Sequence, residues 1–189
     1  MDRLPTLIAL LLLCSGCDEP GGGEPPPSRV IAVGASAQGP DRAAFCEVRS
    51  RRPLSLPELA GPTPTRASGW RWINVWATWC RPCVEELPMI ASWQRRLSEA
   101  GVDVELVLLS ADADAGAVDA FIAAHPEARG SLRAADPDAL PAWIAASGLD
   151  EGAPLPVHLF LDPAGAVRCA RAGALQPHDY DDVAALLSD

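Results

Sequence analysis

The chain has 189 residues, 49% of them hydrophobic, and a formal net charge of −10 at pH 7. This length is enough for one domain with extensions, and the hydrophobic share is enough for a buried core. The acidic balance argues against a polyanionic partner, so we expect no binding to nucleic acid.

The N-terminal residues carry the pattern of a secretory signal. The apolar run Leu4 to Leu13 is too short to span a membrane, which takes roughly 20 residues, and predicts a signal peptide over residues 1–16. Small residues before Cys17 resemble the lipobox of bacterial lipoproteins, which implies lipidation of Cys17; the alternative is a plain secretory signal cut nearby. Residues 17–41 are rich in Gly and Pro and predict a flexible linker, which leaves residues 42–189 as the folded domain.

Strands and helices are expected to alternate along this domain. Phe45 to Val48 predicts an edge strand, Leu54 to Gly61 a short helical turn, and the apolar run Trp72 to Ala77 a buried strand. A helix with its stop at Gly101 follows. The later predicted elements are a strand at Val102 to Leu109, helices at Ala115 to His125 and Asp136 to Ser147, strands at Val157 to Leu161 and Ala166 to Ala170, and a helix at Pro177 to Leu187. Helices between strands indicate a sheet with a parallel core and a final antiparallel hairpin.

Two cysteines lie where the central strand gives way to a helix. Cys80 is placed at the helix N-terminus, where unpaired N–H groups and the helix dipole stabilise a thiolate, the reactive form of cysteine. Pro82 suits the first helical turn, and Cys83, one turn along, is positioned to form a short disulfide with Cys80. The pair could also be half of a zinc site, but the other C-x-x-C of the chain, Cys14 to Cys17, falls in the predicted signal peptide and lipobox, and no His pair has a ligand spacing.

The run Trp76-Ala77-Thr78-Trp79-Cys80-Arg81-Pro82-Cys83, followed by Glu86, Pro88 and the later Leu155-Pro156, resembles the thioredoxin fold. In particular it resembles the membrane-tethered thiol–disulfide oxidoreductases of the TlpA/ResA-like family, over about residues 45–187. The resemblance implies an α/β fold with a central mixed sheet flanked by helices.

The same resemblance implies a role for each matching residue. Cys80 would be the exposed nucleophile that attacks a partner disulfide, and Cys83 the resolving thiol. Pro156 would be a cis-proline facing the cysteines, with Leu155 beside it offering backbone groups to a substrate strand. Glu86 would tune the pKa of the thiols and pass protons; the alternative is a solvated helix residue.

Other residues near the motif have less specific expectations. Trp79, Arg81 and Pro82 would contact the substrate, and Arg81 would favour the Cys80 thiolate. Asn74 stands where ordinary thioredoxins have a buried Asp, a departure that fits the tethered family. His158 is expected near the site but is not favoured as a ligand. The other tryptophans are expected in the core: Trp70, Trp72, Trp76, Trp93 and Trp143.

Cys46 and Cys169 lie outside this motif. In an oxidising compartment two spare cysteines on predicted strands favour a structural disulfide. Free buried thiols are the alternative. A second redox pair is not favoured, because strand cysteines lack activation by a helix end.

The function implied by the resemblance is reduction of partner disulfides outside the cytoplasm, as in cytochrome c maturation or metal-site assembly. The implied partners are disulfide-containing extracytoplasmic proteins, a membrane thiol protein that donates electrons, and the membrane itself through the lipid. The implied location is the bacterial cell envelope, facing the periplasm or the exterior. No cofactor or metal is expected beyond the redox-active Cys80–Cys83 pair. The alternatives are a disulfide-forming oxidase, a copper-binding lipoprotein using Cys80, Cys83 and His158, and a non-catalytic binding module.

Overall fold

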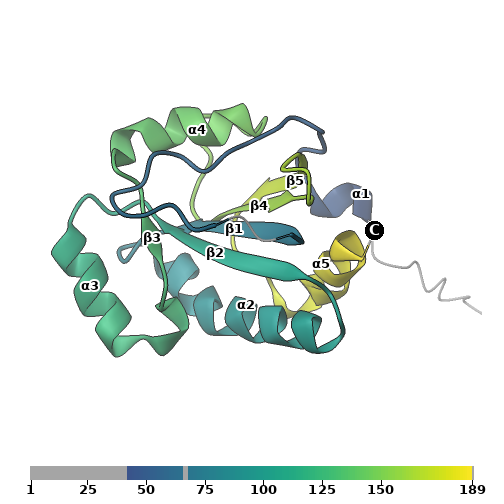
Figure 1. The fold of residues 1–189 in the computed structure, drawn as a ribbon, viewed down its shortest axis with the longest axis horizontal. Helices are drawn as coiled ribbons and strands as arrows, with labels where there is room; N and C mark the ends of the chain where they lie inside the picture. Colours follow the sequence, from purple (N-terminus) through teal and green to yellow (C-terminus); the bar gives the residue numbers. More distant parts are fainter. Residues whose placement is uncertain (1–41, 66–67, 189) are drawn as a thin grey trace, which may run out of the picture. The chain divides into compact units, whose positions relative to one another are not determined.

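The computed structural model describes residues 42–65 and 68–188 (Figure 1). The predicted signal peptide, Cys17 and the predicted linker lie outside these residues. Within the described ranges, no helix has both the length and the apolar character needed to cross a membrane.

A mixed five-stranded sheet forms the centre of the fold, in the order β3-β2-β1-β4-β5. Its strands are β1 (Trp70–Trp76), β2 (Val104–Ser110), β3 (Leu132–Arg133), β4 (Val157–Leu161) and β5 (Val167–Ala172). β1 lies in the middle, parallel to β2 and antiparallel to β4, and β4 and β5 form an antiparallel pair. The predicted parallel core and final hairpin are confirmed. The two-residue β3, parallel to β2, was not predicted.

Helices cover both faces of the sheet. The helices are α1 (Arg42–Phe45), α2 (Arg81–Glu99), α3 (Ala115–Ala124), α4 (Leu140–Ala146) and α5 (Tyr180–Leu187), with 3-10 turns η1 (Pro126–Ala128), η2 (Pro137–Ala139) and η3 (Pro177–Asp179). Figure 1 shows α2 and α5 on one side of the sheet and α4 on the other. The predicted α/β arrangement is therefore confirmed.

β1 is buried along its whole length because it contributes to the core on both faces. Trp72 and Trp76 pack on the side of α2, while Ile73 and Val75 pack on the side of α4. Alternation of side chains along a strand produces this division. A strand covered on both faces reads as a continuous apolar run, which is the pattern that predicted it.

The segment predicted as an edge strand, Phe45 to Val48, is not a strand. Phe45 ends α1, and only Val48 makes a single antiparallel bridge, to Ala170 of β5. Its backbone N–H donates to the Ala170 carbonyl at 3.0 Å. The segment lies along the sheet edge as expected, but one bridge does not make a ladder.

The helical turn predicted at Leu54 to Gly61 is also absent. The Leu54 N–H donates to Gly165 at 3.0 Å, and the Ala60 N–H donates to Arg133 at 2.9 Å. These backbone groups bond to distant segments instead of to their own turn. Tertiary pairing at the sheet edges therefore replaces the local helical bonds.

A disulfide joins Cys46, just after α1, to Cys169 in β5, with a Cα–Cα distance of 5.3 Å. This is the pairing favoured from the sequence. Both residues are buried in the core on the α2 side of the sheet. The bridge fixes the start of the described chain to the edge of the sheet.

Candidate redox site

The two cysteines lie at one end of the sheet, where the chain passes from β1 into α2. Cys80 is the N-cap of α2 and Cys83 lies in its first turn, and the two form a disulfide with a Cα–Cα distance of 5.3 Å. Pro82 occupies the first turn as predicted. The helix continues to Glu99, and Gly101 beyond it has a φ of 85°, so the predicted stop is confirmed.

Cys80 is less accessible than expected for the attacking thiol. It is 5% exposed, and Cys83 is fully buried. The order of exposure still favours Cys80 as the first thiol that a partner reaches. Its low exposure arises because Cys80 packs in the core cluster that includes Trp76 and Leu87.

The turn before Cys80 is held by Asp112, a residue that the sequence did not suggest. The Thr78 N–H donates to Asp112 Oδ2 at 2.9 Å, and the Thr78 hydroxyl donates to Oδ1 at 2.6 Å. The Ser110 hydroxyl donates to the same carboxylate at 2.9 Å. Because β1 and β2 are parallel, the residues that follow the two strands lie together at the same end of the sheet. In the sequence, the polar residues directly after β2 were the signal that could have indicated this contact.

The Leu155–Pro156 peptide bond is cis, as expected. Val75 pairs with Val157, so the antiparallel register places Pro156 beside the end of β1 that leads to Cys80. The Pro156 carbonyl accepts from the Gly173 N–H at 2.8 Å. Within the described residues no hydrogen bond engages the Leu155 backbone.

Two exposed features border the disulfide. Trp79 is 68% exposed, and among the described residues it is the large hydrophobic side chain that stands out in solvent. Arg81 forms an exposed ion pair with Glu85 at 2.7 Å. The hydrogen bond to Glu85, and then its charge, raise the pKa of the Arg81 guanidinium above its ordinary value. Glu85 therefore offsets part of the positive charge that was expected to favour the Cys80 thiolate.

Glu86 is buried, so the alternative of a solvated helix residue is wrong. Its Oε1 accepts from Asn74 Nδ2 at 2.8 Å, and its Oε2 accepts from the Leu175 N–H at 2.8 Å. A pocket of about 310 Å³ lies beside it, lined by Pro82, Glu85, Glu86, Met89, Ala174, Leu175, Gln176 and Pro177. The carboxylate thus lies between the helix that carries Cys83 and a solvent-accessible pocket.

His158 completes this buried group, which the sequence placed only near the site. Trp72 Nε1 lies 3.2 Å from His158 Nδ1, and an indole N–H can only donate. Nδ1 is therefore the acceptor, and the ring proton lies on Nε2, 3.2 Å from Glu86 Oε1. This contact does not meet the geometry of a hydrogen bond, and Nε2 has no hydrogen-bond partner among the described residues. The signal in the sequence was a pair of polar residues, Asn74 and His158, in two paired strands that apart from Arg71 are otherwise apolar.

The buried position of His158 predicts a large stability effect. His158→Ala should lower the free energy of unfolding by about 2–4 kcal/mol, because it leaves the Trp72 N–H without an acceptor and opens a cavity. Urea unfolding measures the change. His178→Ala is the matched control; that ring is exposed, and its removal should cost less than about 0.5 kcal/mol. Equal losses in the two variants would contradict the buried contacts.

The His158 ring is thus engaged by Trp72 and lies against Glu86. Among the described residues no three or more His, Cys, Asp or Glu side chains gather in a way that could hold a metal ion. No observation in the described part of the chain favours the copper-binding alternative.

The architecture is shared with solved structures. A thiol:disulfide interchange protein of the thioredoxin family from Chlorobium tepidum matches with a TM-score of 0.55 and 19% identity, over 75% of this chain and 98% of the other. The chain has the thioredoxin fold. The solution structure of a thiol-disulfide oxidoreductase described as putative, from Bacteroides vulgatus, matches with a TM-score of 0.50 and 26% identity, over 70% of this chain and 82% of the other.

The chain is also similar in sequence to a curated protein. It is 33% identical over 116 residues to a thiol:disulfide interchange protein DsbE homolog from Paracoccus denitrificans. That match covers 61% of this chain and 57% of the relative, so the chain spans less than two thirds of the relative's length. No protein-family model matches. The similarity therefore points to thiol:disulfide oxidoreductases on the thioredoxin fold.

Proposed function

We propose that the chain is an extracytoplasmic thiol:disulfide oxidoreductase that reduces disulfides in partner proteins. The observation that carries the proposal is the Cys80–Cys83 disulfide at the N-terminus of α2. It lies at the same end of the sheet as the cis peptide bond before Pro156. The similarity to interchange proteins supports the same chemistry.

The reaction consists of two exchange steps. In the reduced chain the Cys80 thiolate attacks one sulfur of a partner disulfide, which forms a mixed disulfide and releases one partner thiolate. The Cys83 thiol then loses its proton and attacks Cys80 Sγ, which closes the Cys80–Cys83 disulfide and releases the second partner thiolate. Two electrons pass to the partner, so a membrane thiol protein must afterwards reduce the chain again.

Named residues would position these steps. The Leu155 backbone is available to an extended partner segment, and the exposed Trp79 offers it an apolar contact. Glu86 follows Cys83 by three residues on the same helical face, so we assign it as the group that takes and returns the Cys83 proton. The pocket beside Glu86 supplies the route to solvent. Asp112 would hold the Thr78 turn that places Cys80.

An extracytoplasmic, membrane-tethered location belongs to the same proposal. The signal-like run Leu4 to Leu13 and the lipobox-like residues before Cys17 support it. The Cys46–Cys169 disulfide supports an oxidising compartment. Partners would then be disulfide-containing proteins of the cell envelope, such as apocytochrome c or proteins that assemble a metal site.

The direction of electron flow separates this proposal from a disulfide-forming oxidase. An oxidase needs a strongly stabilised thiolate in its reduced form. Arg81 is the cation best placed to supply that stabilisation, yet it is paired with Glu85. The geometry therefore favours the reductase.

The reduction potential of the Cys80–Cys83 pair tests this direction. Equilibration with dithiol buffers should give a value near roughly −250 mV or lower, as in reducing members of the fold. Mass spectrometry of the alkylated samples should show Cys46–Cys169 unchanged over the titration. A potential near about −120 mV would reject the reductase and assign the chain as an oxidase.

A further inference from the structure

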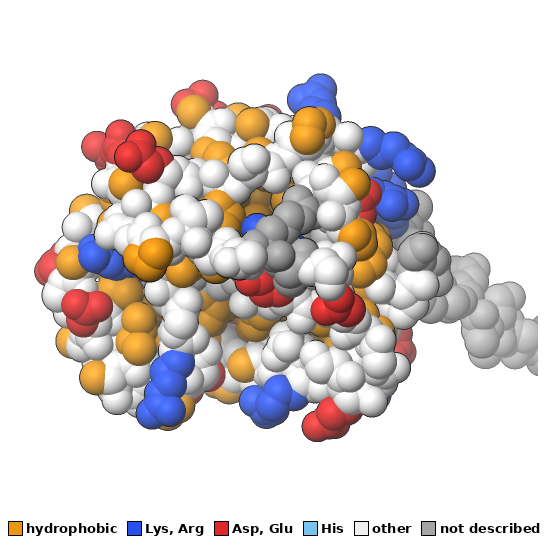
Figure 2. All heavy atoms as spheres, viewed as in Figure 1, with side chains coloured by type: hydrophobic (Ala, Val, Ile, Leu, Met, Phe, Trp, Pro, Cys, Tyr) orange, Lys and Arg blue, Asp and Glu red, His pale blue; other side chains and the backbone are white. Residues whose placement is uncertain are grey.

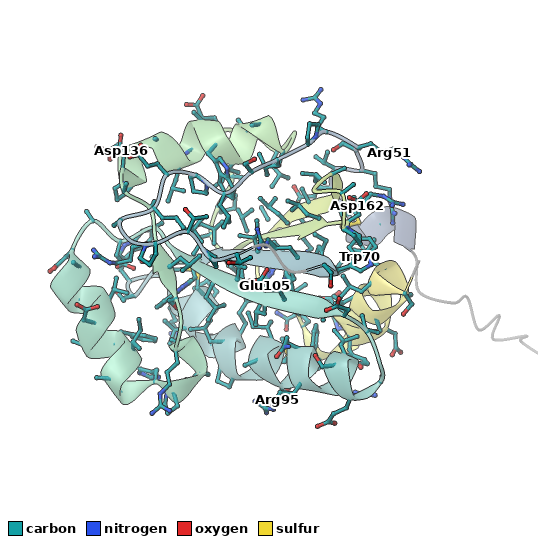
Figure 3. The ribbon with its side chains drawn as sticks, in the orientation of Figure 1. Arg51, Trp70, Arg95, Glu105, Asp136 and Asp162 are labelled. Atoms are coloured by element: carbon teal, nitrogen blue, oxygen red, sulfur yellow. A yellow bond between two sulfur atoms is a disulfide. The ribbon has the colours of Figure 1, made fainter. Side chains whose placement is uncertain are left out.

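A cluster of arginines lies apart from the redox site. Arg49, Arg51 and Arg52 fall within four residues, and all three are exposed. Arg168 of β5 lines the same hollow of about 310 Å³ with Arg49, Ser50, Arg51 and Leu186. We call Arg49, Arg51, Arg52 and Arg168 the basic surface. Figure 2 shows basic side chains gathered on the upper right of the molecule, the region where Figure 3 labels Arg51.

The segment that carries these arginines is fixed to the sheet. The Val48 N–H donates to the Ala170 carbonyl at 3.0 Å, and the Val167 N–H donates to the Arg52 carbonyl at 2.9 Å. The Ser50 hydroxyl donates to the Val167 carbonyl at 3.3 Å. The basic surface is therefore held on a strand-like segment along β5, and its backbone needs no further ordering when it binds a ligand.

Little negative charge balances the basic surface. Arg168 lies 3.7 Å from Asp162, but the other three arginines have no ion pair within the described residues. Glu47 is close in sequence, and its carboxylate accepts from the Ala172 N–H at 2.8 Å. A positive cluster in which three of four arginines have no ion pair within the described residues contrasts with a chain whose formal net charge is −10.

The basic surface lies at the end of the sheet opposite the thiols. The Arg168 guanidinium is 5.9 Å from the ring of Trp70, the first residue of β1. Figure 3 shows Trp70, Asp162 and Arg51 toward the same end of the sheet. β1 then runs seven residues toward Cys80, which at about 3.3 Å per residue separates the two regions by about 23 Å.

The basic surface also lies near the point where residues 1–41 join the described chain. That junction is at Arg42, in α1, and Cys46 directly after α1 is bonded to Cys169, the neighbour of Arg168. A membrane tether in the N-terminal residues would therefore attach beside the basic surface and not beside the redox site.

We propose that the basic surface docks the folded domain onto an anionic membrane surface through lipid phosphate groups. Guanidinium groups suit phosphate because they donate in a planar fork. Docking in this way would direct the Cys80 end of the sheet away from the lipid and leave it free for partner proteins. Each arginine near an anionic bilayer strengthens binding by about fivefold, so the four together can outweigh a repulsive net charge locally.

Vesicle binding of the full chain tests this proposal. The probe is a pair of vesicles, phosphatidylcholine alone and phosphatidylcholine with phosphatidylglycerol, and the full chain carries Cys17→Ala so that no lipid is attached at that position. We expect stronger partitioning onto the anionic vesicles at low salt. Arg49→Gln, Arg51→Gln and Arg52→Gln combined should reduce this preference by about tenfold or more. The N-terminal residues are the same in the parent chain and in every variant, so their contribution cancels when the variants are compared.

A matched variant removes the same charge elsewhere. Arg95→Gln, Arg129→Gln and Arg133→Gln combined should keep the anionic preference. Equal losses in the two triple variants, or no preference in the parent chain, would overturn the proposal. Binding to an acidic protein without binding to anionic vesicles would assign the basic surface to a protein partner instead. Disulfide exchange with a soluble substrate should be unchanged in both variants, so this test stands apart from the redox proposal.

Discussion

Cys83→Ser is expected to abolish turnover and to leave the chain covalently joined to its partners through Cys80. The first exchange step needs only the Cys80 thiolate, so the mixed disulfide still forms. The second step needs a thiol at position 83, and a serine hydroxyl is not nucleophilic enough to replace it. Incubation of the reduced variant with a disulfide-containing protein, followed by non-reducing electrophoresis and mass spectrometry, should show the adduct on Cys80.

Cys80→Ser is the matched variant and should give neither turnover nor adduct. The remaining thiol of the redox pair, Cys83, is fully buried, so a partner disulfide does not reach it. Adducts of equal yield in both variants would show that either thiol can attack, and would reject the assignment of Cys80 as the first nucleophile. Full turnover in either variant would reject dithiol exchange at this pair.

The central strands could be predicted from the sequence because strands buried on both faces have apolar residues at nearly every position. β1 and β4 are apolar at nearly every position, and β4 matches its predicted limits, Val157–Leu161. The long helix was also predictable, since its buried residues recur at helical spacing from Cys83 to Leu97 and Gly101 ends it. These patterns lie within each segment, so they can be recognised without knowing which other elements pack against it.

The edges of the sheet could not be predicted in the same way. Val48, Pro53 and Leu59 each make a single bridge to a residue distant in the sequence. No local periodicity marks a segment held by isolated bridges. The two-residue β3 is likewise defined only by its pairing with β2.

The cysteine motif was predictable from chain neighbours, and the cis bond before Pro156 from the family resemblance, but the contacts that other residues make across the sheet were not predictable. Cys80, Cys83 and Pro82 share one helical turn, and their arrangement was expected. Strand pairing brings His158 to Trp72, 86 residues away in the sequence, and brings Asp112 to Thr78, 34 residues away. A polar residue inside a buried strand is costly unless it is paired, so Asn74 and His158 together were the clue to this group.

Removal of the Cys46–Cys169 disulfide is expected to cause a large loss of stability. The bridge closes a loop with a sequence separation of 123 residues, and the chain-entropy estimate for so long a loop is about 5 kcal/mol. Typical domains unfold with about 5–15 kcal/mol, so Cys46→Ala with Cys169→Ala should bring the chain close to its limit of stability. Urea unfolding without reductant, compared with the unaltered chain, measures this change.

The second disulfide provides the control. Cys80–Cys83 has a sequence separation of three, and the same entropy estimate gives only about 2 kcal/mol for its loss. Equal destabilisation by the two double variants would contradict a stabilising role that grows with loop length. The Cys46 and Cys169 variant should still exchange disulfides where it remains folded, because neither residue belongs to the redox pair.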